Sequence, residues 1–174
     1  MNVLPVAGKL ATLVFVSLFL VACSNTDTSE ADAAAAEAAA AASAAAEAAA
    51  AEAAEAAAAQ QALQEAADAV GTVFYFEFDS SALTDAARTA VDAHIAALLG
   101  NDASVRLEGH TDERGTREYN LALGERRANA VRDYMVANGV PSYRIESISY
   151  GEENPAAYGS GESNWQQNRR VELK

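Results

Sequence analysis

Two kinds of residue are missing from parts of the first 70 positions of this 174-residue chain. Residues 31–59 contain no aromatic side chain, which excludes an aromatic core there. The segment from Asp27 to Asp68 holds nine acidic residues and no basic one, so it carries most of the formal net charge of -13. The remainder, residues 69–174, has eleven basic and sixteen acidic residues and a net charge of only -5. Such a domain has no basic stripe that could follow a phosphate backbone, which argues against nucleic acid as a partner.

Residues suited to catalysis are also scarce. The two histidines are separated in the sequence, and a zinc site needs clustered His, Cys or carboxylate ligands. His94 stands beside Ile95 in an expected helix, and His110 has no obvious serine or cysteine nucleophile with a third partner. We therefore predict a non-enzymatic module without metal or cofactor. The alternative is a wall hydrolase that uses a pair of carboxyl groups on a glycosidic bond.

The N-terminus has the pattern of an export signal. Lys9 precedes a short apolar run over residues 10–22, too short for a membrane span of about 20 apolar residues. The run ends at Cys23, the only cysteine, and the letters LVAC resemble the bacterial lipobox, in which the cysteine becomes the lipidated first residue. The resemblance predicts a signal peptide over residues 1–22 and lipid attachment at Cys23, which would anchor the chain stably. By the same resemblance, Ser24 points to the outer membrane rather than to retention in the inner one.

Residues 23–70 predict an alanine-rich helical tether. Alanine is the best helix former, so a long helix is locally favoured. The segment has no apolar stripe and no large hydrophobic residue before Leu63, so we do not expect it to bind tightly to a core. At the helical rise it would reach roughly 70 Å, long enough to act as a spacer. An alanine-seamed oligomeric coil is the alternative, although the glutamates show no clean heptad and would repel one another.

The pattern from Gly71 onward is that of a globular domain. Phe74, Phe76 and Phe78 alternate and predict one buried face of a strand. In chain order we expect a strand over 73–78, a helix between Thr84 and Gly100, a strand over 105–108 and a helix over about 119–138. After these we expect a strand over 145–150, a short helical turn carrying Trp165, and a strand over 171–173. In the helix over about 119–138, the residues expected to face inward are Leu121, Ala128, Val131 and Met135. The order β-α-β-α-β-(α)-β predicts an α+β fold, a mixed sheet with helices packed on one face.

Three motifs in this region, in order, carry a family resemblance. They are FEFD at residues 76–79, EGHTDERGT at residues 108–116 and YNLALGERRANAV at residues 119–131. Together they resemble the OmpA-like peptidoglycan-binding domain, over about residues 72–173. The details of the second and third motifs are closest to the lipid-anchored members of that family.

The resemblance implies a site for a diaminopimelate-containing wall peptide. Such a peptide presents an ammonium and a carboxylate on one carbon, so its site needs an anion and a cation at a fixed separation, and the planar fork of an arginine can bind a carboxylate through two hydrogen bonds. Asn120 lies seven residues before Arg127, about two helical turns, so both project from one helix face. The residues that the resemblance assigns to peptidoglycan binding are Asp112, Arg127, Asn120, Phe78, Asp79 and Leu123.

Each of these residues also has a plain structural interpretation. Asp112 alone could be a solvated or helix-capping loop carboxylate, and Arg127 alone could be an exposed helix arginine in a weak ion pair. Asp79 could bond its own backbone in a turn. Arg169 and Arg170 could support the electrostatics of the site or form a charged strand edge. The joint pattern favours a binding site.

The resemblance also implies the partners and the location. It predicts an outer-membrane lipoprotein on the periplasmic side that tethers the membrane to peptidoglycan and contacts TolB of the Tol system through an overlapping surface. Such a protein would support envelope integrity and constriction at cell division. A lipid-anchored wall binder outside the Tol system is the alternative.

Overall fold

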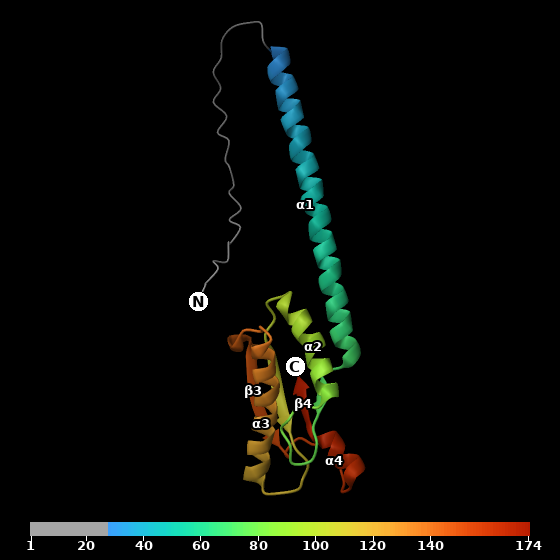
Figure 1. The fold of residues 1–174 in the computed structure, drawn as a ribbon, viewed down its shortest axis with the longest axis vertical. Helices are drawn as coiled ribbons and strands as arrows, with labels where there is room; N and C mark the ends of the chain where they lie inside the picture. The colour runs from blue at the N-terminus through green and yellow to red at the C-terminus, as the bar shows by residue number, and fades with distance from the viewer. Residues whose placement is uncertain (1–27) are drawn as a thin grey trace. The chain divides into compact units, whose positions relative to one another are not determined.

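The computed structural model describes residues 28–174, so the predicted signal peptide and Cys23 lie outside the described residues. The chain divides into two units, residues 1–47 and residues 48–174. The elements are α1 (Thr28–Val70), β1 (Val73–Tyr75), α2 (Asp85–Leu99), β2 (Val105–His110), α3 (Arg117–Ala137), the 3-10 turn η1 (Ser142–Arg144), β3 (Ile145–Gly151), α4 (Glu162–Asn168) and β4 (Arg170–Leu173) (Figure 1).

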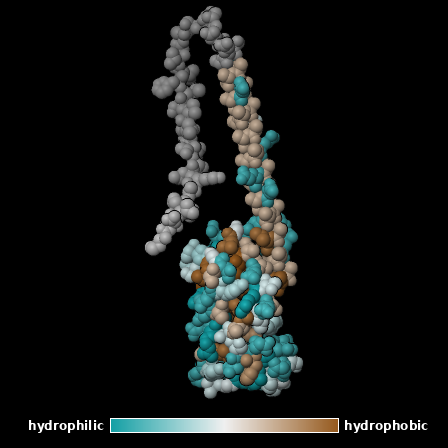
Figure 2. Space-filling model, viewed as in Figure 1, coloured by the Kyte–Doolittle hydropathy of each residue, from teal (hydrophilic) through white to brown (hydrophobic). Residues whose placement is uncertain are grey.

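Helix α1 confirms the predicted alanine-rich helix. It runs for 43 residues, and the side chains of residues 32–59 are all exposed, as expected for a helix without an apolar stripe. Its surface in Figure 2 is pale brown, interrupted by hydrophilic spots. Among residues 28–174, none of the helices combines the length and the apolar character that crossing a membrane requires.

The last turns of α1 belong to the unit of residues 48–174. Ala67 is fully buried, and the Gln60 side-chain amide donates a 2.8 Å hydrogen bond to the carbonyl oxygen of Ala97 in α2. The expectation that the alanine-rich segment does not bind to a core holds for residues 32–59. It is wrong at Gln60 and Ala67. Alanine has no long side chain, so its helix can approach a neighbour closely and bury a methyl group.

The sheet has four strands in the order β1-β4-β2-β3. β4 pairs antiparallel with both β1 and β2, whereas β2 and β3 are parallel and are joined through α3. A parallel pair needs a crossover connection, and α3 supplies it. The mixed sheet predicted from the element order is confirmed.

One face of this sheet packs against α2 and α3. The larger side chains of the buried cluster are those of Phe74, Phe76, Val91, Ile95, Leu98, Leu107, Val131, Met135, Val140, Ile145 and Val171. Thr84 caps α2 by accepting from the backbone N–H of Ala87 at 3.1 Å, and α2 ends before Gly100, both as predicted. Leu121, expected in the core, is only partly buried, while Leu123 is buried instead.

The first strand ends earlier than its alternation predicted. β1 stops at Tyr75, and although Phe74 and Phe76 are buried, Phe78 is 57% exposed. The chain turns just after it, because Asp79 adopts a left-handed backbone conformation with φ of 52°. The prediction that Phe78 lies on the buried face of the strand is therefore wrong.

A close backbone contact between β2 and α3 positions the loop that joins them. A Cβ atom on Gly109 would lie 2.0 Å from the carbonyl oxygen of Gly124, so only glycine allows this approach. The contact brings the end of β2 against the first turns of α3. Residues 111–116, which connect the two elements, therefore lie beside the helix face that carries Asn120 and Leu123.

Candidate functional site

A cavity of about 240 Å³ lies where the loop after β1 meets the loop after β2 and the first half of α3. We call it the loop pocket. Its lining residues are Phe78, Asp79, Thr111, Asp112, Arg114, Gly115, Tyr119, Asn120, Leu123 and Arg127. All six residues that the family resemblance singled out in the globular domain therefore line one cavity, although they come from three separate stretches of the chain.

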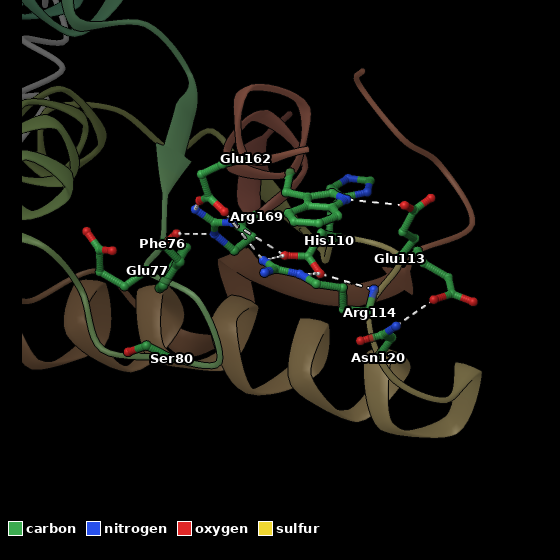
Figure 3. Close-up of polar contacts among 12 residues, drawn as sticks. Phe76, Glu77, Ser80, His110, Glu113, Arg114, Asn120, Glu162 and Arg169 are labelled. Atoms are coloured by element: carbon green, nitrogen blue, oxygen red, sulfur yellow. Dashed lines mark hydrogen bonds and ion pairs between the residues drawn. The ribbon is translucent and has the colours of Figure 1, made fainter. Parts of the chain in front are cut away.

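Asp112 is the buried anion of the loop pocket, with 4% of its surface exposed. Arg114 donates to its carboxylate through Nη2 at 2.6 Å and through Nε and the backbone N–H at 3.1 Å each. Arg169 Nη1 lies 3.4 Å from the same carboxylate, next to Arg114 (Figure 3). Burial raises the pKa of Asp112, but the hydrogen bonds from Arg114 and the charge beside it more than offset this and hold the pKa below its usual value. Asp112 therefore stays ionised at neutral pH.

Arg127 is fully buried, so its interpretation as an exposed helix arginine is wrong. It donates to three backbone carbonyls, those of Ser80 at 2.8 Å, His110 at 2.9 Å and Glu77 at 3.0 Å. Burial lowers the pKa of Arg127 to about 10, so it remains protonated at neutral pH. A guanidinium has five N–H donors, so two remain beyond these three bonds, and Arg127 lines the loop pocket. Arg127 thus ties the loop after β1 to the end of β2 while contributing charge to the pocket.

Arg114, which the sequence patterns did not single out, is the more accessible cation of the pocket. Its side chain is 30% exposed, and its guanidinium lies over the rings of Phe78 and Trp165, at 4.0 and 4.1 Å from the ring centroids. Stacked arginines of this kind are held in place by the aromatic faces. The only available signal was its position two residues after Asp112, because nothing in the local sequence shows that Trp165 comes near.

Of the two arginines at the start of β4, only Arg169 belongs to the site. It is 5% exposed, contacts Asp112, and donates to Glu162 at 2.5 Å and to the carbonyl oxygen of Phe76 at 3.1 Å. Arg170 instead pairs with Glu172 on the sheet. The interpretation as a charged strand edge is wrong, because both side chains are buried and β4 lies between β1 and β2 in the sheet.

The remaining predicted residues form the walls of the pocket. Asn120 is 1% exposed and donates to the Glu152 carboxylate at 2.5 Å, which fixes the side chain toward the loop after β3. The Asp79 carboxylate accepts a short hydrogen bond from the Tyr119 hydroxyl, so it is held by another segment rather than by its own turn. Leu123 is buried and lines the cavity.

Comparison with known proteins places the chain in a family. The model of the OmpA family matches residues 75–169. A Pseudomonas aeruginosa protein named peptidoglycan-associated lipoprotein is 58% identical over 110 residues, which are 63% of this chain and 66% of the relative. A relative of the same name from Pseudomonas putida is 57% identical over 111 residues, covering 64% of this chain and 67% of the relative. The matched region thus spans about two thirds of the length of these relatives.

A solved structure agrees with these relatives. The crystal structure of the peptidoglycan-associated lipoprotein from Burkholderia pseudomallei has a TM-score of 0.58 and 42% identity, covering 59% of this chain and 87% of that one. The predicted α+β fold, the subgroup suggested by the motifs and the prediction that the chain is not an enzyme are confirmed by these comparisons. The chain belongs to the OmpA family.

Proposed function

We propose that this chain is an outer-membrane lipoprotein that binds peptidoglycan noncovalently and tethers the membrane to the wall. The observation that carries the proposal is the loop pocket, in which one buried carboxylate and two arginines line a cavity of about 240 Å³. The names of the relatives support the same assignment.

The ligand that fits the loop pocket best is the free amino-acid end of a diaminopimelate stem peptide. Its ammonium would bind the Asp112 carboxylate, and its carboxylate would bind the cations beside it, Arg127 and Arg114. Arg114 engages Asp112 in the structure, so the ligand ammonium must share that carboxylate or displace Arg114. The contact between Asp112 and Arg169 keeps the carboxylate in place during the exchange.

The other parts of the chain suit a tether. Lipid on Cys23 would hold the outer membrane, and a continuous helix of 43 residues spans about 65 Å at a rise of about 1.5 Å per residue. A single weak contact with the wall would be sufficient for each molecule, because many copies in one membrane act together.

The partnership with TolB and the Tol system, and with it a role in constriction at cell division, is part of the proposal. It is supported by the motif details at residues 112–116 and 124–131 and by the names of the relatives. A wall binder outside the Tol system would have the same loop pocket, so the pocket does not distinguish the two. Co-purification of TolB with the chain from its own cells would distinguish them.

The direct test is sedimentation with purified, insoluble peptidoglycan. We would use the soluble chain, meaning residues 23–174 with Cys23→Ser so that no lipid is attached. Asp112→Asn removes the charge at nearly constant shape, and we expect it to leave the protein in the supernatant while the unsubstituted soluble chain sediments. The matched control is Asp133→Asn, because Asp133 is an exposed carboxylate paired only with Arg132 in the described structure.

Two outcomes would count against the proposal. If the unsubstituted soluble chain does not sediment, wall binding is wrong and a protein partner becomes the leading function. If Asp112→Asn sediments as well as the Asp133→Asn control, the wall contact lies outside the loop pocket. Fluorescence of Trp165, the only tryptophan, reports whether each variant is folded.

A further inference from the structure

A second cavity, of about 590 Å³, lies on the flank of the sheet beside β1. We call it the flank cavity. β1 and the residues after it form one wall, the start of α2 forms a second and α4 forms a third. The lining includes Tyr75, Glu77, Glu162, Gln166, Gln167 and Arg169. It is larger than the loop pocket, and the proposed function does not use it.

The side chains of the flank cavity favour an uncharged, polar ligand. Its one cation, Arg169, already contacts the carboxylates of Glu162 and Asp112 and the carbonyl oxygen of Phe76. An anionic ligand would therefore find no available positive charge among the lining residues. Glu77 adds a negative charge, which disfavours an anion further.

The same side chains are those that recognise hydroxyl groups and rings. Tyr75 is 51% exposed, so one aromatic side chain is available for a ligand to pack against. Gln166 and Gln167 are exposed carboxamides, which offer both donors and acceptors, and the Glu77 carboxylate offers acceptors. A sugar ring has an apolar face and a rim of hydroxyl groups, so this set of side chains matches it on both counts.

The flank cavity and the loop pocket share a wall. Glu77 lines the flank cavity, while its carbonyl oxygen accepts a hydrogen bond from Arg127 of the loop pocket. Arg169 also lines the flank cavity, and its Nη1 reaches Asp112 of the loop pocket at 3.4 Å. Figure 3 shows Glu162 and Arg169 side by side at this wall, with Arg114 next to them. A ligand bound in the loop pocket can therefore continue over this wall into the flank cavity.

We propose that the flank cavity is a subsite for an amino-sugar ring of the glycan strand to which the stem peptide is attached. The inference rests on the proposed function, because it assigns the part of the same ligand that lies beyond the loop pocket. It gives the protein two contacts with peptidoglycan, an ionic one to the peptide and a neutral one to the sugar.

The test separates the two contacts with two ligands, the stem tripeptide alone and the same tripeptide carried on its disaccharide. Binding of each to the soluble chain is measured by calorimetry. The variants are Tyr75→Ala and Gln166→Ala, both at exposed positions, so that the fold does not depend on either. The control is Tyr143→Ala, which removes another exposed tyrosine, located in η1 and outside the lining of both cavities.

We expect the disaccharide to improve the affinity of the unsubstituted chain by about tenfold, which corresponds to about 1.4 kcal/mol. Tyr75→Ala and Gln166→Ala should each remove at least about half of that gain in free energy and leave the affinity for the tripeptide unchanged. Tyr143→Ala should change neither. An absent gain, or a gain that survives both substitutions, would overturn the subsite.

Failure of the proposed function gives a different pattern. If the tripeptide does not bind, but the disaccharide form binds and depends on Tyr75 and Gln166, the loop-pocket assignment is wrong and the sugar subsite stands. If neither ligand binds, both proposals are overturned.

Discussion

The exposed part of α1 and the sheet domain that follows it are stabilised in different ways. In α1 the side chains of residues 32–59 are all exposed, and the helix depends on the intrinsic preference of alanine and on its own backbone hydrogen bonds. In the region after Val70, residues from every major helix and strand share one buried cluster. A substitution in the first region should therefore act locally, and a substitution in the second should act on the whole unit.

This difference also explains where the two cavities are found. A binding site needs side chains held in fixed positions by surrounding contacts, and the loops at the end of the sheet have such contacts through Arg127, Asn120 and Arg169. The alanine side chains of α1 have neither the length nor the polar atoms to build a site.

We expect the largest loss of stability from Arg127→Leu. The substitution leaves three carbonyl oxygens, those of Glu77, Ser80 and His110, without their donor, so the sheet domain should lose on the order of 4 kcal/mol of unfolding free energy. Urea unfolding followed by Trp165 fluorescence measures this loss. Circular dichroism in the same samples should still show the helix signal of α1.

The matched control for this experiment is Arg132→Leu. Arg132 is on the same helix, but it is partly exposed and pairs with Asp133 at the surface, so its removal should cost within about 0.5 kcal/mol. Equal losses from the two arginine variants would show that the buried carbonyl contacts of Arg127 do not stabilise the domain.

Gly109→Ala should have the next largest effect. Its new methyl group would lie 2.0 Å from the carbonyl oxygen of Gly124, and backbone cannot move aside as a side chain can, so we expect a loss of about 3 kcal/mol. Gly71→Ala serves as the control, because its methyl group has open space. The only cost is the backbone strain of an alanine at a φ of 75°, about 1 kcal/mol. Thermal unfolding of both variants decides the question, and a smaller loss from Gly109→Ala than from Gly71→Ala would contradict it.

The stability of the sheet domain should depend on pH through His110. Burial, with a contribution from the charge of Arg170, lowers the pKa of His110 from 6.5 to about 4. The unfolded chain therefore binds the proton first as the pH falls, and stability that is fully present above pH 6.5 declines between about pH 6.5 and pH 4, by up to about 3 kcal/mol.

His110→Phe tests this assignment. Phenylalanine keeps a ring that can stack on Tyr150. Both ring nitrogens of His110 lack a hydrogen-bond partner in the described structure, so the substitution breaks no observed hydrogen bond of the ring. We expect unfolding free energies measured in urea between pH 4 and pH 7 to lose most of their slope in this variant. An unchanged slope would assign the pH dependence to other groups.

The smallest effect should come from the exposed part of α1. Ala45→Gly should lower the helix signal locally, at a cost of about 1 kcal/mol to that stretch of helix, and leave the Trp165 unfolding curve unchanged. Ala67→Leu adds bulk at a fully buried position near the end of the same helix, so it should shift that curve by about 1–3 kcal/mol. A shift caused by Ala45→Gly would mean that the two regions are coupled more closely than the contacts indicate.

Much of this protein can be predicted from its sequence where the signal is local. The helix propensity of alanine predicts α1, Thr84 and Gly100 mark the ends of α2, and the order of strands and helices predicts the mixed sheet. The motifs that resemble the OmpA family also select six residues that line one pocket. The alanine helix and the ends of α2 depend on residues that are close together in the sequence. The mixed sheet and the pocket residues follow from the order of elements and motifs along the chain.

The tertiary structure alone decided the roles that depend on distant segments. The burial of Arg127 against three carbonyls, the stacking of Arg114 between Phe78 and Trp165, and the burial of Ala67 all join stretches that are separated along the chain. The desolvation and the hydrogen-bond partners of a side chain are properties of its surroundings in space. Those surroundings form only when the loops after β1 and β2 meet α3 and α4.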